Sequence, residues 1–76
     1  MDGIKHLGVV ALLVDKPESG LKRGDVGTVV QAFESNQHHT GGCIVEFVDE
    51  AGKVVALLDV TNLSEIVPLN LKLRAA

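Results

Sequence analysis

The order of hydrophobic and polar residues along the chain predicts an all-β domain made of short strands. A continuous apolar run at residues 8–14 is typical of a strand that is buried on both faces. Later runs rich in β-branched residues predict further strands, because such side chains favour extended backbone. These strands are expected at residues 26–35, 43–48, 53–59 and 65–67, with a single 3₁₀ turn at 61–64 before the last.

Glycine, proline and aspartate mark the connections. The chain breaks after the first strand at residues 15–20, and Leu21 is expected to hold this loop to the core. Gly24 and Gly27 predict a tight turn at residues 23–27, in which Asp25 accepts hydrogen bonds from turn amides. Residues 49–52 have the composition of a hairpin turn, with Gly52 in the left-handed conformation.

Five short strands, a long first loop and a turn before the last strand predict a small five-stranded SH3-like barrel. Closure of the barrel would protect most strand edges from pairing with other chains. We expect one domain over residues 1–76, with the barrel at 8–67 and an amphipathic tail at 68–76.

The tail alternates leucine with polar residues, which predicts an extra C-terminal edge strand. Pro68 lacks an N–H donor and therefore suits only an edge. Leu69, Leu71 and Leu73 would lie on one face of this strand and need an apolar surface to cover. We expect the tail to cross to a second copy, although folding back onto its own chain would also bury the leucines.

The predicted third and fourth strands are apolar on both faces. If Cys43, Val45 and Phe47 face the interior, Ile44 and Val48 share the outer face with Glu46. In the fourth strand Val55 and Leu57 are expected outside, and Val54, Ala56 and Leu58 inside. Because a small barrel has one interior, the outer apolar side chains predict an interface, unless the first loop and the tail cover them.

Composition and charge narrow the possible partners. Hydrophobic residues make up 46% of the 76-residue chain and aromatic residues 3%, so the core must be mainly aliphatic. A net charge of −3 argues against general nucleic-acid binding, which needs a basic face. Lys16, Lys22 and Arg23 form either a small positive patch or a solvated loop. The apolar run at 9–14 is too short to span a membrane, and a single cysteine excludes an internal disulfide, so we expect a cytoplasmic protein.

Residues that could carry chemistry are few. His38, His39 and Cys43 have zinc-ligand chemistry, but adjacent side chains on an extended segment point apart. Cys43 with a nearby histidine could be a nucleophile pair, although no motif supplies an oxyanion hole. Asp15, Glu18 and Asp25 lack the spacing of a calcium loop. We therefore expect no catalytic residue, no metal and no cofactor.

Nearly the whole chain resembles a family of small bacterial proteins described as domain-of-unknown-function family 4926. The resemblance is carried most specifically by residues 20–21, 24–30 and 45–52, with the sequences GL, GDVGTVV and VEFVDEAG. It implies a small SH3-like barrel without known enzymatic activity. The glycine and valine turn is also similar to that of KOW-type barrels, which bind RNA or RNA polymerase.

These observations predict a non-enzymatic protein-interaction or self-associating module, with a homodimer or a small protein as the partner. The expected interface comprises Ile44, Val48, Val55, Leu57, Leu69, Leu71 and Leu73. The alternative is a KOW-like domain that binds nucleic acid or assists transcription, for which Lys22 and Arg23 would supply the charge.

Overall fold

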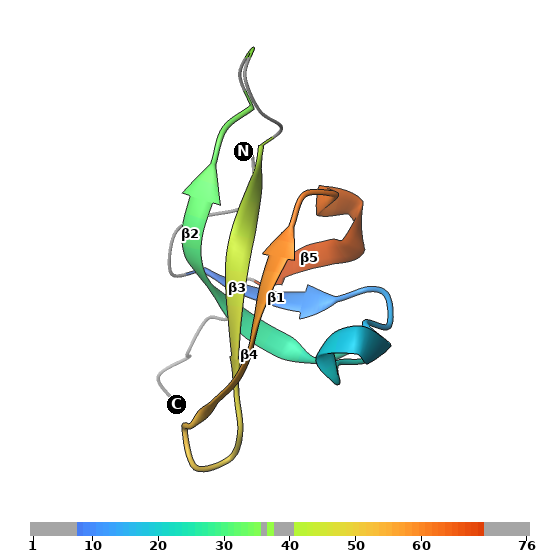
Figure 1. Ribbon diagram of the computed structural model, residues 1–76, viewed down its shortest axis with the longest axis vertical. Helices are drawn as coiled ribbons and strands as arrows, with labels where there is room; N and C mark the ends of the chain where they lie inside the picture. The colour runs from blue at the N-terminus through green and yellow to red at the C-terminus, as the bar shows by residue number, and fades with distance from the viewer. Residues whose placement is uncertain (1–7, 36, 38–40, 70–76) are drawn as a thin grey trace, which may run out of the picture.

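The computed structural model describes residues 8–35, 37 and 41–69, and places them in one antiparallel β-sheet. Two short 3₁₀ helices, η1 (Pro17–Ser19) and η2 (Leu63–Glu65), lie in the connections before β2 and β5. The strands are β1 (Val9–Leu12), β2 (Val26–Phe33), β3 (Gly42–Val48), β4 (Val54–Val60) and β5 (Ile66–Leu69) (Figure 1). The all-β, five-stranded fold predicted from the sequence is therefore confirmed.

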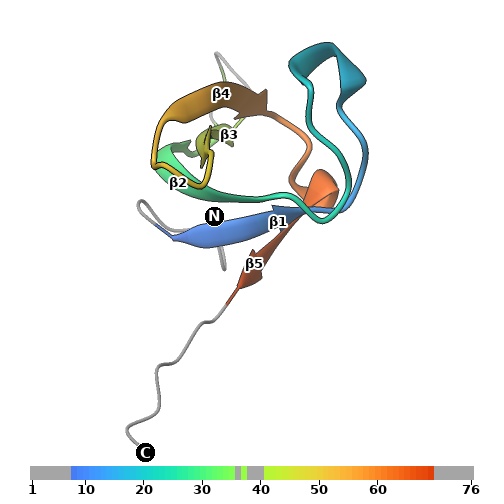
Figure 2. The ribbon, with the colours of Figure 1, turned by 90° about the horizontal axis from the view of Figure 1, so that it is seen from below.

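The sheet has the strand order β4-β3-β2-β1-β5 and curls around a single core (Figure 2). An irregularity in the β2–β3 ladder leaves Val30 without an opposite residue, and such a bulge increases the local bend of a strand. The curl does not lead to closure, because β4 and β5 do not pair in the described chain. The barrel closure expected from the sequence is thus wrong, and the sheet keeps two edges.

The first strand is shorter and less buried than its apolar run suggested. Val10 and Leu12 are buried, whereas Val9 and Ala11 are half-buried. Leu13 is exposed, although its amide donates to the carbonyl of Glu65 in the same register as the β1–β5 ladder. The expectation of burial on both faces was wrong because the curved sheet has an interior on one side only.

The last strand continues beyond the boundary expected at residue 67. Pro68 and Leu69 both belong to β5, where they lie opposite Val10 and Val9 of β1. Proline is tolerated here because β5 is an edge strand whose outer side needs no donor. The remaining tail, residues 70–76, lies outside the described residues.

The core is aliphatic apart from Phe47 and Cys43, which are both buried. Phe33, the other phenylalanine of the sequence, is only half-buried. Gly42 belongs to β3 rather than to the preceding loop, and a Cβ atom there would overlap the carbonyl oxygen of Val60, which explains the glycine. The buried hydrophobic residues are Val10, Leu12, Leu21, Val29, Cys43, Val45, Phe47, Leu58, Val60 and Ile66.

Leu21 is buried, as predicted, and holds the first connection to this core. Lys16 and Leu21 pair across the base of the connection through two backbone hydrogen bonds, with η1 at its tip. Over the described part of the chain, no helix has the length and apolar character needed to cross a membrane.

Candidate functional site

The alternation of side chains in β3 separates a buried face from an outer face. Cys43, Val45 and Phe47 are buried, as predicted. Ile44 points away from them and is half-buried, and Val48 lies at the exposed end of the strand. The outer face of β3 therefore becomes more exposed toward the β3–β4 hairpin.

In β4 the structure corrects one expected position. Val55 and Leu57 are exposed, as predicted, and Leu58 is buried. Val54 was expected inside, but it is exposed. The reason is a register shift: Phe47 lies opposite Ala56 and Val48 lies opposite Val54, so Val55 is an extra residue that resets the alternation.

A further exposed valine, Val26, begins β2 on the same outer face. The pairing of β2 with β3 begins at Thr28, opposite Glu46, and Val26 lines the same surface hollow as Val48. Val26 was not among the interface residues expected from the sequence. Its position two residues before Thr28 in the same strand places both side chains on one face, and this spacing could have identified it. We define the outer patch as Val26 (52% exposed), Val48 (49%), Val54 (48%), Val55 (57%) and Leu57 (61%).

A surface hollow of about 280 Å³ adjoins the outer patch. Leu21 and Phe47, both buried in the core, contribute to its lining, and Val26, Val48 and Val55 of the outer patch line it too. The hollow lies where the turn before β2 approaches the end of the β3–β4 hairpin. The hollow is therefore lined by residues of the core and of the outer patch together with Gly20 and Asp25.

Aspartate carboxylates organise the turn beside the hollow. The carboxylate of Asp25 accepts a hydrogen bond from the amide of Lys22 at 3.0 Å, which confirms its predicted role. The amide of Arg23 donates to the carboxylate of Asp15 at 2.9 Å. Both aspartates therefore accept hydrogen bonds from backbone amides of this turn.

The two glycines predicted to form this turn have different roles. Gly24 adopts φ +94°, in the left-handed region, and belongs to the turn at residues 22–25. Gly27 lies inside β2, so the turn is shorter than expected. A Cβ atom at Gly27 would lie 2.6 Å from Cγ1 of Val45 and 2.9 Å from the carbonyl oxygen of Glu46.

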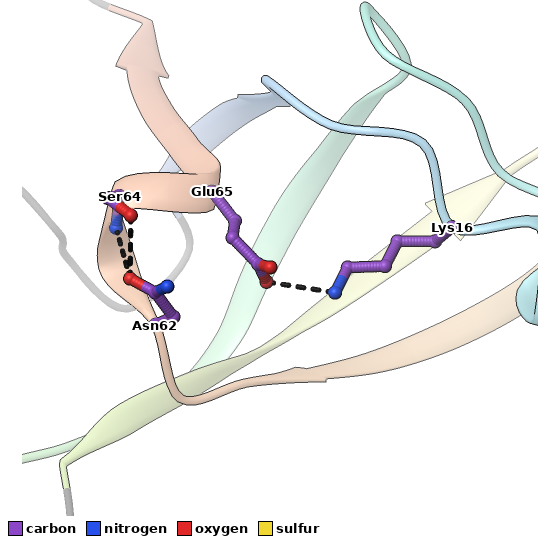
Figure 3. Close-up of polar contacts among 4 residues, drawn as sticks. All are labelled: Lys16, Asn62, Ser64 and Glu65. Atoms are coloured by element: carbon purple, nitrogen blue, oxygen red, sulfur yellow. Dashed lines mark hydrogen bonds and ion pairs between the residues drawn. The ribbon is translucent and has the colours of Figure 1, made fainter.

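One ion pair joins the first connection to the segment before β5 (Figure 3). Nζ of Lys16 lies 2.9 Å from Oε1 of Glu65. The side chain of Asn62 caps η2 by accepting from the amide and hydroxyl of Ser64 at 3.1 and 2.6 Å. Lys16 is thus paired with an acidic side chain. Of the three cations in the expected positive patch, Lys22 and Arg23 are the exposed ones.

Cys43 has the surroundings of a core residue. Its side chain is buried, and burial together with the charge of Asp59 raises the pKa of the thiol. A raised pKa disfavours the thiolate, the form that acts as nucleophile or metal ligand. His38 and His39 lie outside the described residues, and within those residues no three His, Cys, Asp or Glu side chains gather as a metal site.

The expected tail interface is only partly within the structure. Leu69 is half-buried and paired with Val9, so it belongs to the sheet rather than to a free tail. Leu71 and Leu73 lie outside the described residues.

Comparison with known proteins identifies the family but adds no relative of known function. No curated protein and no solved structure matches the chain. One family model, described as a domain of unknown function, matches residues 7–64. This match covers most of the chain, from just before β1 to η2, so the outer patch, the hollow and the turn all lie within it. The chain therefore belongs to the family of domain of unknown function DUF4926.

Proposed function

We propose that this protein is a non-enzymatic binding module that associates with a second copy of itself through the outer patch. The observation that carries the proposal is the gathering of five exposed aliphatic side chains on neighbouring strands next to an unpaired sheet edge. Contiguous apolar surface of this kind on a small domain is typical of an interaction site. The buried Cys43, with its raised thiol pKa, is consistent with a protein without a reactive nucleophile.

The size of the domain favours self-association. A chain of 76 residues buries a small core, and a two-fold contact would add apolar burial from both copies at once. Fully burying an aliphatic side chain is worth roughly 1.5–3 kcal/mol, so half-exposed residues each recover only part of that amount. Association itself has a substantial entropic cost. We therefore expect a dimer whose population depends on concentration in the micromolar range.

Light scattering after size exclusion, across the micromolar to millimolar range, tests this proposal. A double variant, Val55→Ser with Leu57→Ser, removes apolar side chains from the outer patch. The matched control, Val67→Ser with Leu13→Ser, removes one exposed valine and one exposed leucine outside the patch. We expect the wild type and the control to dimerise and the patch variant to remain monomeric. A monomeric wild type at every concentration would refute the proposal.

The tail remains a second predicted contributor. Leu71 and Leu73 would add apolar surface to a dimer if the segment after β5 crosses to the second copy. Because Leu69 belongs to β5, a shortened chain for this test must end at Leu69 and keep the strand intact. Loss of the dimer on this truncation would assign the contact to the tail.

The charges near the turn weigh against the alternative, nucleic-acid binding. Lys22 and Arg23 lie beside Asp15 and Asp25, whose carboxylates bind their amides. Such a mixed surface is a weak attractor for phosphates. Filter binding to RNA and DNA at low and moderate salt checks this, and tight, steeply salt-dependent binding would replace our proposal with the KOW-like function.

A further inference from the structure

We propose that the C-terminal segment of one copy, residues 70–76, adds as an antiparallel strand to the free edge of β4 in a second copy. The pairing rests on the proposed self-association and names the segment that reaches the second copy. It places a strand at the open side of the sheet, where β4 and β5 do not pair in the described chain. Two-fold symmetry forms the same contact twice in each dimer.

β4 has a free edge and a regular stretch that can take another strand. Among the strands of the described chain, β4 pairs with β3 only. Residues 56–60 lie opposite 43–47 without interruption, since the extra residue of this ladder, Val55, precedes them. N–H and C=O groups along such an edge can pair with a strand from another chain. The other edge, β5, contains Pro68, which lacks a donor, so β4 is the better template.

The inner side of this edge is where the core is least covered. Among the buried hydrophobic residues Leu58 has the largest exposed fraction, 9%. Ala56, the next residue on the same side of β4, is only half-buried, and it lies opposite the buried Phe47. Apolar side chains of an added strand would remove this remaining surface from water.

The outer side of the same stretch combines an apolar side chain with carboxylates. Leu57 is 61% exposed, and Asp59 is exposed two residues later. Glu46 of β3 lies opposite Leu57 and is half-buried. Such a surface favours a strand whose outer side chains are cations with long aliphatic stems. The edge of β4 therefore fits a strand that alternates apolar residues with lysine or arginine.

The tail has this alternation and this charge. Residues 69–76 read LNLKLRAA, which alternates leucine with polar residues and contains two cations and no acidic side chain. Pairing of residues 71–75 with 56–60 uses the whole regular stretch of β4. It directs three apolar side chains toward the interior, each opposite an inner residue of β4: Leu71 opposite Val60, Leu73 opposite Leu58, and Ala75 opposite Ala56.

The same register places the cations on the outer side. Lys72 lies directly opposite Asp59, and opposite charges in this position stabilise a strand pair. Arg74 lies opposite Leu57, so its aliphatic stem covers that leucine while its guanidinium group extends toward Glu46 on the next strand. The most exposed residue of the outer patch is thus covered together with the inner edge.

Other registers lose this match. A shift by one residue turns the leucines outward and the cations inward. A shift by two residues in one direction places Asn70 opposite Asp59, which leaves the carboxylate without a cation opposite. A shift by two in the other direction places Arg74 opposite Asp59 but moves Leu71 beyond the end of β4.

The direction of β5 assigns the tail to a second copy. β4 and β5 run in the same sense along the sheet, because every neighbouring pair between them is antiparallel. A tail antiparallel to its own β4 would have to reverse directly after Leu69, and a reversal uses at least two residues. The alternation instead continues from Leu69 to Leu73 without glycine or proline, which is typical of an uninterrupted strand.

Reciprocal charge reversal in the full-length chain tests the register. Asp59→Lys places an ammonium group opposite Lys72, and Lys72→Asp places a carboxylate opposite Asp59. Each variant alone has two repulsive pairs per dimer where the wild type has two attractive ones, so we expect its dimer dissociation constant to rise about tenfold or more. An equimolar mixture of the two variants restores both attractive pairs. We therefore expect a one-to-one heterodimer, detected by native mass spectrometry with one variant isotopically labelled.

Matched controls separate this geometry from a general effect of charge. Lys22→Asp and Glu18→Lys make the same changes of net charge on exposed residues of the first connection, and their mixture should show no preference for heterodimers. A full-length double variant, Leu71→Ser with Leu73→Ser, should lose the dimer. Circular dichroism confirms that every variant is folded.

The outcomes distinguish the tail pairing from self-association as such. A serine variant that dimerises like the wild type overturns the tail pairing while the proposed self-association stands. Loss of the dimer in the serine variant, with charge reversals that leave the dissociation constant unchanged, overturns the register on β4. A wild type that is monomeric at every concentration overturns both proposals.

Discussion

Substitution of Gly27 by alanine tests how closely β2 and β3 approach. The added methyl would lie 2.6 Å from Cγ1 of Val45, 2.9 Å from the carbonyl oxygen of Glu46 and 2.9 Å from Cδ2 of Phe47. Val45 and Phe47 are buried, and the carbonyl belongs to the paired strand β3, so these neighbours have little room to move. Forcing an extra methyl into a packed core typically costs about 1–3 kcal/mol. We expect a loss of about 2 kcal/mol in the free energy of unfolding.

Urea denaturation followed by far-ultraviolet circular dichroism is the appropriate assay, because the chain has no tryptophan or tyrosine for fluorescence. For a small domain the free energy falls by roughly 1 kcal/mol or slightly more per molar urea. The expected loss therefore moves the midpoint down by up to about 2 M. The substitution uses alanine rather than a larger residue such as valine, because a domain of this size has a small free energy of unfolding and must stay folded for the measurement.

Gly24 provides the contrasting control. A Cβ atom there meets no atom within 4 Å, but its φ of +94° disfavours any side chain. Gly24→Ala should destabilise through backbone strain, and Gly24→Asn should do so less, since asparagine tolerates left-handed backbone better. At Gly27, where crowding is the cause, asparagine should be worse than alanine. An unchanged midpoint for Gly27→Ala, or rescue of position 27 by asparagine, would refute the steric reasoning.

Three further predictions concern polar groups. Asp49→Ala should lower the free energy of unfolding by about 1–2 kcal/mol, because its carboxylate accepts hydrogen bonds from two hairpin amides; thermal denaturation measures this. A double-mutant cycle with Lys16→Met and Glu65→Gln should give a coupling below about 1 kcal/mol that weakens with added salt, since the pair is partly exposed; coupling that persists in high salt would contradict this. Burial, with a smaller effect of Asp59, raises the pKa of the Cys43 thiol above its usual 9.0, so the unfolded chain releases this proton first. The free energy of unfolding should therefore fall more steeply above pH 9.0 in the wild type than in Cys43→Ala, and equal slopes in urea titrations would argue against it.

Local chemistry in the sequence predicted much of this fold. Alternation placed Cys43, Val45 and Phe47 in the core, and the left-handed Gly52 followed from hairpin composition. These features depend on neighbouring residues alone. The capping role of Asp25 is of the same kind, since its carboxylate reaches an amide three residues away.

Features that depend on register or curvature were not predictable in this way. The extra residue Val55 exposes Val54, and no residue type marks such a bulge in a run of valines. The ion pair of Lys16 with Glu65 joins segments far apart in sequence. Whether β4 and β5 pair depends on the curvature of the whole sheet. The sequence therefore predicted the strands correctly but did not predict that the sheet stays open between β4 and β5.

The position of β1 has a consequence for how the chain folds. β1 lies between β2 and β5, so its ladder on one side is formed by residues 66–69, more than fifty positions later. Closing such a long loop has an entropic cost before any contact is gained, and sheets dominated by distant pairings fold in milliseconds to seconds. During synthesis, β2, β3 and β4 can assemble as successive hairpins, but one side of β1 stays unpaired until Leu69 has left the ribosome. The N-terminal strand is therefore the last to be completed, which makes the nascent chain most open to wrong pairing near its beginning.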